Sequence, residues 1–405
     1  MMKKKSLLII LFFSVIFSVY SQDTVQVVTY NLLRFNSSTD RNLDFENIMN
    51  YISPDVLIVQ EMVNNEGFLN FQNNILKNID DKYLSADFID DENTDIDQAL
   101  FYNQNKFEFI STSKLDGDPR PIYIFELRHK ETEVNFLVFN LHLKASKGSD
   151  NEARRRDQVV DLKNYLSEMD DYFYVVAGDL NIYSTNEDAY NQLFSITESG
   201  KGNLHDLVSL SGTYNNPDYS IIHTQSTRTT QFGGGSHGGL DDRFDFILFS
   251  DSLMFSDRVF VIDSSYKTVG NDGKHYNLAI NEQPNFSVPS DISNSLHNAS
   301  DHLPVSVNII FSKEKIYRDV LNFESNKLNE NILIYPNPSK TKIKINSKIL
   351  LINSIQVYDN SGRIILSKNI NSNTTEIDIS NLLLGSYWIR LNFYFGSKNF
   401  KIIKN

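Results

Sequence analysis

Tyr174-Val175-Val176-Ala177-Gly178-Asp179-Leu180-Asn181 is the stretch from which the fold can be derived, because it predicts a buried strand ending in two polar side chains. Its β-branched and aromatic residues favour an extended chain, and Gly178 allows another part of the backbone to pass closely where the strand ends. Side chains alternate along an extended segment, so Asp179 and Asn181 point to one face. A carboxylate can hold a proton or a hard cation, and an amide can donate and accept hydrogen bonds. Taken alone, the stretch is more readily explained as an Asx-rich strand-to-loop turn.

Other strands of the chain also end in polar side chains that a protein core would exclude. Any one of them has an ordinary explanation, such as a cap, a turn or a satisfied histidine. Several strand ends of this kind together indicate a shared site, because α/β folds bind ligands at strand ends. The residues are Asn31, Glu61, His142, Asp179 with Asn181, Asp245, and Asp301 with His302.

Strands alternate with helices between residues 24 and 311, but several strands follow one another directly. This pattern favours a mixed α/β sandwich over a purely parallel sheet. Residues 213–239 and the segment from 264 to 300 are expected to be loops. The spacing of apolar residues predicts helices at 44–52, 68–79, 152–168 and 189–194.

Composition limits the classes of protein to which the chain can belong. A length of 405 residues is long for one core and suggests two or three units. The absence of cysteine excludes disulfides, thiolate chemistry and cysteine zinc sites. The formal net charge of -13 gives no general attraction for nucleic acid, but a hydrolase needs only a local positive centre, often a metal ion.

The N-terminus has the organisation of a signal peptide. Three lysines at 3–5 precede an apolar run at 7–19, and the polar Gln22 follows the small residue Ser21. This pattern predicts cleavage after Ser21, so that residues 1–21 are removed on export. The alternative is a membrane anchor, for which the apolar run is short.

Residues 332–405 differ from the rest, because only short strands at regular spacing are found there. Turn signals such as Asp359-Asn360-Ser361-Gly362 separate them. This spacing predicts a separate small immunoglobulin-like β-sandwich, joined by a linker at 316–331. Its strands are expected at 342–346, 354–358, 363–368, 386–391 and 398–403.

The residue types at the strand ends match the hydrolysis of a phosphate ester. That reaction needs a hard cation, oxygen ligands that hold it, an activated water and a donor for the phosphoryl oxygens. Glu61 and Asp301 offer hard oxygen ligands, and Asn31 offers a neutral one. A histidine beside a carboxylate can stay protonated or gain basicity near neutral pH.

These residues lie in motifs that resemble, in order, those of the endonuclease/exonuclease/phosphatase superfamily, which includes pancreatic-type deoxyribonucleases, abasic-site endonucleases, neutral sphingomyelinases and inositol polyphosphate phosphatases. The resemblance covers about residues 24–311, and within the superfamily the chain is most similar to the deoxyribonucleases. It implies a four-layer α/β sandwich, two packed mixed sheets flanked by helices, as the catalytic domain at 22–315. The motifs are TYNLL with Asn31, IVQEM with Glu61, NLHLK with His142, GDLN at 178–181, RFDFIL at 243–248 and SDHLPV at 300–305.

The resemblance implies a metal site and a histidine–carboxylate pair. Glu61 would be the main ligand of Mg²⁺ or Mn²⁺, with Ca²⁺ also considered, and Asn31 and Asp301 would assist it. His302, oriented by Asp245, would act on the attacking water or on the phosphate.

The resemblance also gives roles to the remaining strand ends. Asp179 and Asn181 would position the nucleophile and a phosphoryl oxygen, with Asp179 a possible base; which residue is the general base stays open. His142 stands where abasic-site enzymes usually carry a tyrosine. It therefore indicates the deoxyribonuclease and sphingomyelinase branches, in which it would be a phosphate donor or general acid.

Three further residues are expected to bind substrate. Arg128 ends a strand and could contact phosphate or form a surface salt bridge. Arg155 lies in an arginine run at 154–156 that could line the scissile strand, although such runs more often form a solvated helix start. His237 lies in a glycine-rich loop at 233–239 that lacks the spacing of a P-loop.

The C-terminal unit resembles the sorting domain that the type-nine secretion system of Bacteroidota recognises. Ile334-Tyr335-Pro336-Asn337-Pro338 opens it, and Lys401-Ile402-Ile403-Lys404-Asn405 ends the chain. The resemblance covers about residues 332–405. It implies passage across the outer membrane, followed by release or surface attachment. The alternative is an ordinary immunoglobulin-like accessory module.

We therefore expect a secreted, divalent-metal-dependent phosphodiesterase, a nuclease that cleaves extracellular DNA or RNA with little sequence preference. A monomer without a stable protein partner is expected. One alternative is a hydrolase of phospholipid, sphingomyelin or another small phosphodiester. The alternative from another class is a catalytically inactive binding protein attached to the surface.

Overall fold

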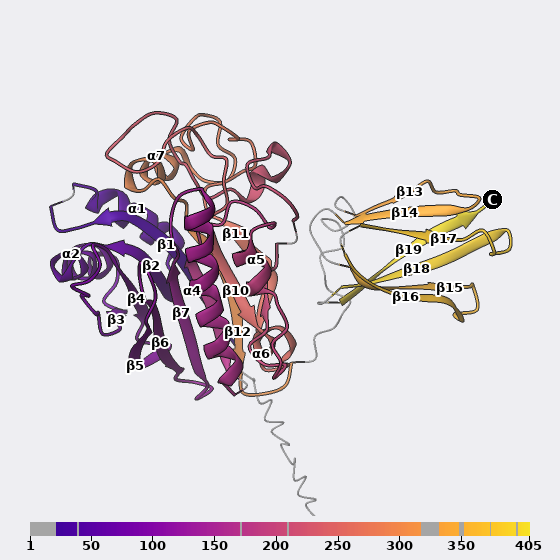
Figure 1. The fold of residues 1–405 in the computed structure, drawn as a ribbon, viewed down its shortest axis with the longest axis horizontal. Helices are drawn as coiled ribbons and strands as arrows, with labels where there is room; N and C mark the ends of the chain where they lie inside the picture. The colour runs from indigo at the N-terminus through magenta and orange to yellow at the C-terminus, as the bar shows by residue number, and fades with distance from the viewer. Residues whose placement is uncertain are drawn as a thin grey trace, which may run out of the picture.

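Two six-stranded mixed sheets form the centre of the N-terminal unit (Figure 1). Each sheet contains one parallel pair, β1 with β2 in the first and β7 with β8 in the second, among antiparallel neighbours. The first sheet has the order β11 (Val259–Thr268), β12 (Val305–Ser312), β1 (Gln22–Phe35), β2 (Val56–Met62), β4 (Asp97–Asn103) and β3 (Tyr83–Ser85), and the second has the order β5 (Phe107–Leu115), β6 (Ile122–His129), β7 (Asn135–His142), β8 (Phe173–Asp179), β10 (Asp245–Ser250) and β9 (Leu204–His205).

The two sheets pack face to face through the alternating apolar side chains of their strands. On β1, Val25 and Val27 lie in the core between the sheets, whereas Val28 and Tyr30 lie in the core on the outer side. Phe136 and Val138 of β7 complete the inner core from the second sheet. Because both faces of these strands are buried, their sequences are almost continuously apolar.

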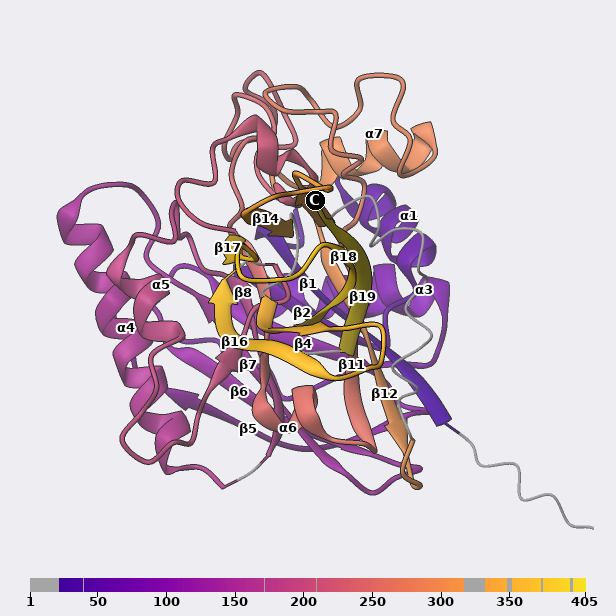
Figure 2. The same cartoon turned by 90° about the vertical axis from the view of Figure 1, so that its right-hand side faces the viewer.

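Helices cover the outer faces of both sheets, as Figures 1 and 2 show. This arrangement confirms the four-layer α/β sandwich expected from the sequence. The first sheet is covered by α1 (Asn42–Ile52), α2 (Asn65–Phe71), the π-helix η1 (Gln72–Leu76), α3 (Lys77–Ile79) and α7 (Ser290–Ala299), the second by α4 (Ser149–Glu168) and α5 (Asp188–Leu193), while α6 (Asp251–Phe255) and the 3₁₀ helix η2 (Pro217–Ile222) lie in connections.

Helix α7 lies inside a segment that the sequence predicted to be a loop. Its serine-rich and asparagine-rich sequence has weak helix propensity. Ile292, Leu296 and Ala299 are nevertheless buried in the same core as Ile48 of α1. The helix therefore depends on tertiary packing, which a local pattern does not contain.

The C-terminal unit consists of two antiparallel sheets around one apolar core, which confirms the expected small β-sandwich. Ile343, Ile355, Ile389 and Ile402 are among its fully buried residues. Strands β13 and β17 were not expected from the sequence. The sheets are β13 (Ile332–Tyr335), β14 (Lys342–Ser347) and β17 (Thr374–Asp378), and β16 (Ile364–Ser372), β15 (Ile352–Tyr358), β18 (Gly385–Phe393) and β19 (Gly396–Lys404).

The computed structural model describes most of both units. None of the helices in these residues is long and apolar enough to cross a membrane. The expected signal peptide at 1–21, and the expected linker apart from Ile316, lie outside the described residues. The described ranges are 22–38, 40–170, 172–208, 210–316, 332–347, 352–372, 374–393 and 396–405.

Candidate active site

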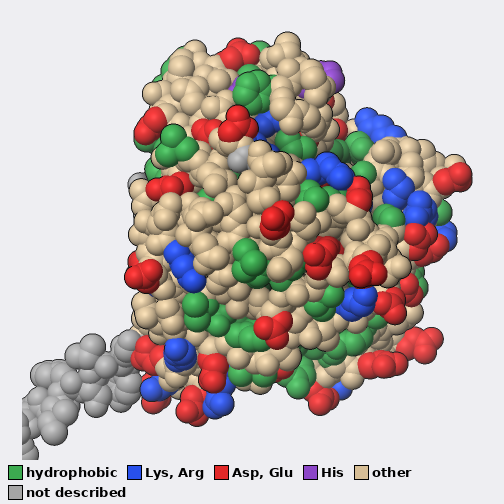
Figure 3. Space-filling model, turned by 90° about the vertical axis from the view of Figure 1, so that its left-hand side faces the viewer, with side chains coloured by type: hydrophobic (Ala, Val, Ile, Leu, Met, Phe, Trp, Pro, Cys, Tyr) green, Lys and Arg blue, Asp and Glu red, His purple; other side chains and the backbone are tan. Residues whose placement is uncertain are grey.

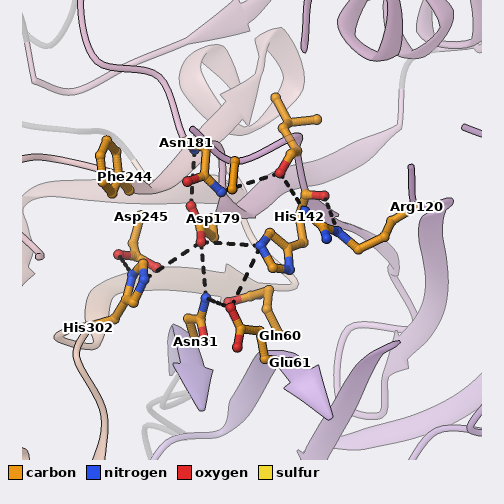
Figure 4. Close-up of polar contacts among 12 residues, drawn as sticks. Asn31, Gln60, Glu61, Arg120, His142, Asp179, Asn181, Phe244, Asp245 and His302 are labelled. Carbon is orange, nitrogen blue, oxygen red and sulfur yellow. Dashed lines mark hydrogen bonds and ion pairs between the residues drawn. The ribbon is translucent and has the colours of Figure 1, made fainter. Parts of the chain in front are cut away.

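The polar strand ends of both sheets meet at one edge of the sandwich (Figure 4). Parallel pairing of β7 with β8 places His142 opposite Asp179, and antiparallel pairing of β8 with β10 places Asp245 on the other side of Asp179. Gly178 has a φ of 138°, and a Cβ there would collide with the carbonyl oxygen of Leu141. The close backbone passage predicted for Gly178 is therefore confirmed.

Asp179 lies at the centre of the cluster. Its Oδ2 accepts a hydrogen bond from Asn31 Nδ2 at 3.0 Å and lies 3.5 Å from His142 Nε2 and 3.7 Å from His302 Nε2. Its Oδ1 accepts the backbone N–H of Asn181 at 3.0 Å. Burial, opposed by His302 and reinforced by nearby carboxylates, raises the pKa of Asp179 to about 7. Asp179 can therefore exchange a proton near neutral pH.

His302 and Asp245 form a buried histidine–carboxylate pair. The distance between His302 Nδ1 and Asp245 Oδ2 is 2.7 Å, so Nε2 is the ring nitrogen that faces Asp179. Burial opposes the charged ring, but the carboxylates of Asp245, Asp179 and Asp301 outweigh it and raise the pKa of His302 well above its ordinary value. The pair is thus suited to holding a proton on His302.

His142 has the opposite electrostatic environment. Burial, together with the charges of Arg120, His302 and Lys144, lowers its pKa well below the ordinary value. Its Nε2 lies 3.9 Å from Glu61 Oε1, and its buried Nδ1 has no hydrogen-bond partner in the described part of the chain. A neutral imidazole of this kind can serve as a metal ligand or as a hydrogen-bond donor.

Glu61, His142 and Asp179 can hold a divalent cation. One ligand atom from each side chain lies within 4.8 Å of the others. Two carboxylates and one imidazole suit Mg²⁺ or Mn²⁺ among the common ions, with the imidazole favouring Mn²⁺. Glu61 is prepared for this role, because its φ of 64° turns the chain at the strand end and its Oε2 accepts the N–H of Arg34 at 2.9 Å.

Asn31 and Asp301, which were expected to bind the metal together with Glu61, do not present a ligand atom to it as Glu61 does. Asn31 presents its nitrogen, and not its oxygen, to Glu61 and Asp179, because its Oδ1 accepts the N–H of Leu33 at 2.9 Å. Asp301 is not part of the three-residue group. Its Oδ2 accepts the N–H of Ser236 at 2.6 Å, and its buried Oδ1 has no partner in the described residues. The metal group in this structure is therefore built around Glu61 with His142 and Asp179.

Arg128 and Arg155, which were expected to contact substrate, have protein partners in the structure. Arg128 lies opposite Asn135, at the end of β7 remote from the site, and its guanidinium lies 3.6 Å from Glu133. Arg155 is fully buried and bound by Glu187 at 2.9 and 2.7 Å.

His237, in contrast, is exposed in a loop that lies beside the site. The N–H of Ser236 in this loop donates to Asp301, and a Cβ at Gly235 would collide with the Asp301 carboxylate. Contact of His237 with substrate stays a prediction.

Arg120 is a site residue that the sequence did not reveal. Its Nε donates to the carbonyl oxygen of His142 at 3.0 Å, and its Nη2 donates to that of Leu143 at 2.8 Å. Burial lowers its pKa, while the charges of Asp179 and Glu61 act in the opposite direction. The sequence signal was an arginine just before β6, which is the end of that strand nearest the site.

A buried amide pair joins the two sheets directly beneath the cluster. Gln60 Nε2 donates to Asn140 Oδ1 at 2.8 Å, and Asn140 Nδ2 donates to the carbonyl oxygens of Val59 and Ala99. Gln60 precedes Glu61 and belongs to the first sheet, whereas Asn140 belongs to the second, two residues before His142. The pair therefore sets the spacing between Glu61 and His142.

Replacing Asn140 with alanine should lower the free energy of unfolding by about 2 kcal/mol, because a buried amide and two carbonyl groups lose their partner. Urea unfolding of the mature protein measures this loss. Asn151, a half-buried residue of α4 that donates to the carbonyl of Lys147, provides the control variant Asn151→Ala, with an expected change below about 0.5 kcal/mol. Equal stabilities of the two variants would contradict the role assigned to the amide pair.

Binding of Mg²⁺ or Mn²⁺ should strengthen as the pH rises through about 7, because Asp179, with a pKa of about 7, must lose its proton to accept the ion. The same raised pKa makes the metal-free fold less stable as the pH rises from about 4 to about 7, since the unfolded aspartate is already ionised there. Calorimetric titration at several pH values measures both affinity and proton release. Asp179→Asn should bind without this proton release; equal release by both proteins would contradict the assignment.

The layered α/β sandwich carries, at one edge, a buried carboxylate–histidine cluster that could hold a metal ion. The model of the endonuclease/exonuclease/phosphatase family matches residues 28–302, and the chain belongs to this family. Its members are metal-dependent phosphodiesterases and phosphatases. The resemblance seen in the motifs is thereby confirmed at the level of the family.

Several solved structures are similar to the N-terminal part of the chain. A Bacteroides thetaiotaomicron endonuclease/exonuclease/phosphatase family protein is 18% identical over 72% of this chain and 96% of its own, with a TM-score of 0.44. The catalytic domain of human Nocturnin is 18% identical over 71% and 97%, with a TM-score of 0.45. Truncated Caenorhabditis elegans TDP2 is 14% identical over 71% and 97%, with a TM-score of 0.46. A comparison with curated proteins found no match.

The C-terminal unit has its own family match. The model of the secretion system C-terminal sorting domain matches residues 333–405. This domain marks proteins exported by the type-nine system and implies an interaction with that machinery. The protein is therefore secreted or attached to the cell surface, as the sequence predicted.

Proposed function

We propose that the protein is an extracellular nuclease, a divalent-metal-dependent phosphodiesterase that cleaves DNA or RNA with little sequence preference. The observation that carries the proposal is the single buried cluster in which Glu61, His142 and Asp179 meet the His302–Asp245 pair. The proposed organisation is a signal peptide at 1–21, a catalytic domain at 22–315, a linker at 316–331 and a sorting domain at 332–405.

In the proposed reaction each side chain acts at a stated atom. A bound divalent ion would neutralise phosphoryl oxygens and polarise the phosphorus. Asp179 would accept the proton of the attacking water; its pKa of about 7 belongs to the metal-free site, and a bound ion would keep its carboxylate ionised and ready to accept. His302, held by Asp245, donates a hydrogen bond from Nε2 to a phosphoryl oxygen once that nitrogen is protonated and turned from Gln225 to the substrate. His142, on the other side of Asp179, would hold the ion through its Nε2 together with Glu61.

The surface charge supports local and not general recognition of a polyanion. The chain carries a formal net charge of -13. On the face shown in Figure 3, acidic and basic side chains are interspersed. A bound ion would supply local attraction for phosphate together with Arg120, whose guanidinium is held beside the site by the carbonyls of His142 and Leu143.

Digestion of supercoiled plasmid by the mature protein tests the proposal. Nicking is expected with Mg²⁺ or Mn²⁺, none with EDTA, and nicking slowed by about 10²- to 10⁴-fold with His302→Ala. End-labelled linear DNA and RNA then distinguish endonuclease from exonuclease action. If neither nucleic acid is cleaved with any metal, the nuclease proposal is wrong; hydrolysis of sphingomyelin or inositol phosphates would then support the small-phosphodiester alternative, and no hydrolysis would support the inactive binding protein.

A further inference from the structure

The segment 224–227 lies between the start of β10 and residues 300–303, and its backbone is hydrogen-bonded on both sides. Gln225 donates to the carbonyl oxygen of Asp242 at 3.1 Å and accepts the N–H of the same residue at 2.9 Å. On the other side, the N–H of Leu303 donates to the carbonyl oxygen of Thr224 at 2.8 Å, and that of Thr227 donates to Asp301 at 3.1 Å. The position of Gln225 relative to His302 is therefore set by the backbone.

The carboxamide of Gln225 contacts two buried site residues at once. Its Nε2 lies 2.6 Å from His302 Nε2 and 3.3 Å from Asp301 Oδ2. The other ring nitrogen of His302 is bound by Asp245, so Gln225 acts on the nitrogen that faces Asp179. His302 and Asp301 are each 3% exposed, whereas Gln225 is half-buried and lies on their solvent side.

We propose that Gln225 is a positioning residue for hydrolysis at this site, which holds the imidazole of His302 and the carboxylate of Asp301 in one arrangement. This inference rests on the proposed function. Asp245 fixes one nitrogen of the ring, but a single hydrogen bond leaves the ring free to tilt about that contact. The carboxamide nitrogen of Gln225 can only donate, so this second contact is a hydrogen bond when the ring proton lies on Nδ1, toward Asp245, and Nε2 accepts; in that state it defines the direction in which His302 points. Asp301 gains a donor besides the N–H of Ser236.

The variant Gln225→Met tests the hydrogen bonds separately from packing, because methionine has a similar volume and shape but no amide. In the mature protein, kcat for phosphodiester hydrolysis should fall about 10- to 100-fold, the range typical of groups that orient the residues of a metal site. KM should change less than about threefold, since a positioning residue acts on the reacting groups and not on substrate affinity.

The control variant is Gln104→Met. Gln104 is a half-buried glutamine whose amide donates to the carbonyl oxygen of Asp81, at the opposite end of the first sheet. Gln104→Met makes the same chemical change at a position that does not contact the site. The kcat of this variant should equal that of the unmodified protein. Thermal unfolding of both variants establishes that the fold is retained.

A spectroscopic measurement separates this inference from the proposed function. The imidazole signals of His302, assigned with the variant His302→Gln, should shift in Gln225→Met and stay unchanged in Gln104→Met. If the unmodified protein hydrolyses no phosphodiester, the proposed function is wrong. The role of Gln225 is then tested by the His302 signals alone. Unchanged His302 signals, or an unchanged kcat in an active enzyme, overturn the role of Gln225.

Discussion

Replacing His302 with alanine should lower the rate of phosphodiester hydrolysis by about 10²- to 10⁴-fold, the range that a positioned proton-transfer group contributes. His302 Nε2 is the only ring nitrogen of the pair that faces the cluster, because Nδ1 is bound by Asp245 at 2.7 Å. The surrounding carboxylates raise the pKa of His302, which favours a proton on this nitrogen during the reaction. Alanine removes both this donor and the ring.

His302→Ala also leaves Asp245 buried without its partner, which lowers stability as well as activity. His302→Gln serves as the matched variant, because its amide can still donate to Asp245. The two variants should be equally slow, while the glutamine variant should unfold at the higher temperature. Single-turnover rates and thermal unfolding measure the two effects. Retention of more than about a tenth of the activity by either variant would remove His302 from the reaction.

Replacing Glu61 with glutamine should lower the rate by about 10³-fold and remove the stabilisation by divalent ions. A metal ion contributes several kcal/mol of charge stabilisation in the transition state, and about 4 kcal/mol corresponds to this factor. Glu61 is the carboxylate of the metal group that comes from the first sheet, and it is held by Asn31 and by the N–H of Arg34. Glutamine keeps the size of the side chain but removes its charge.

Thermal unfolding with and without Mg²⁺ or Mn²⁺ measures the binding part of this prediction, because an ion that binds only the native state raises the unfolding temperature. Glu66→Gln is the control: this nearby glutamate is exposed and accepts a hydrogen bond from Ser37. It should keep the full metal effect and the full rate. An equal metal-induced rise in Glu61→Gln and Glu66→Gln would show that the ion binds elsewhere.

The sequence by itself determined the layered architecture and most members of the cluster. Strand formation and the alternation of side chains are local properties, so apolar runs that end in Glu61, His142 and Asp179 already placed these residues at strand ends. The close passage at Gly178 could be predicted for the same reason, since only glycine has no Cβ to obstruct a neighbouring strand. The order of the motifs then indicated the family.

Only the tertiary structure decided how these residues face one another. Arg120 and Gln225 reach the site from connecting segments, where no periodic pattern indicates the direction of a side chain. Arg155 illustrates the converse, because a run of arginines does not reveal which member turns inward to a partner such as Glu187.

The bridge between Gln60 and Asn140, and the existence of helix α7, likewise depend on residues far apart in the chain. Such contacts form only when the two sheets and their helices have packed. Their energies come from burial and from satisfied hydrogen bonds between elements, and a local stretch of sequence contains neither.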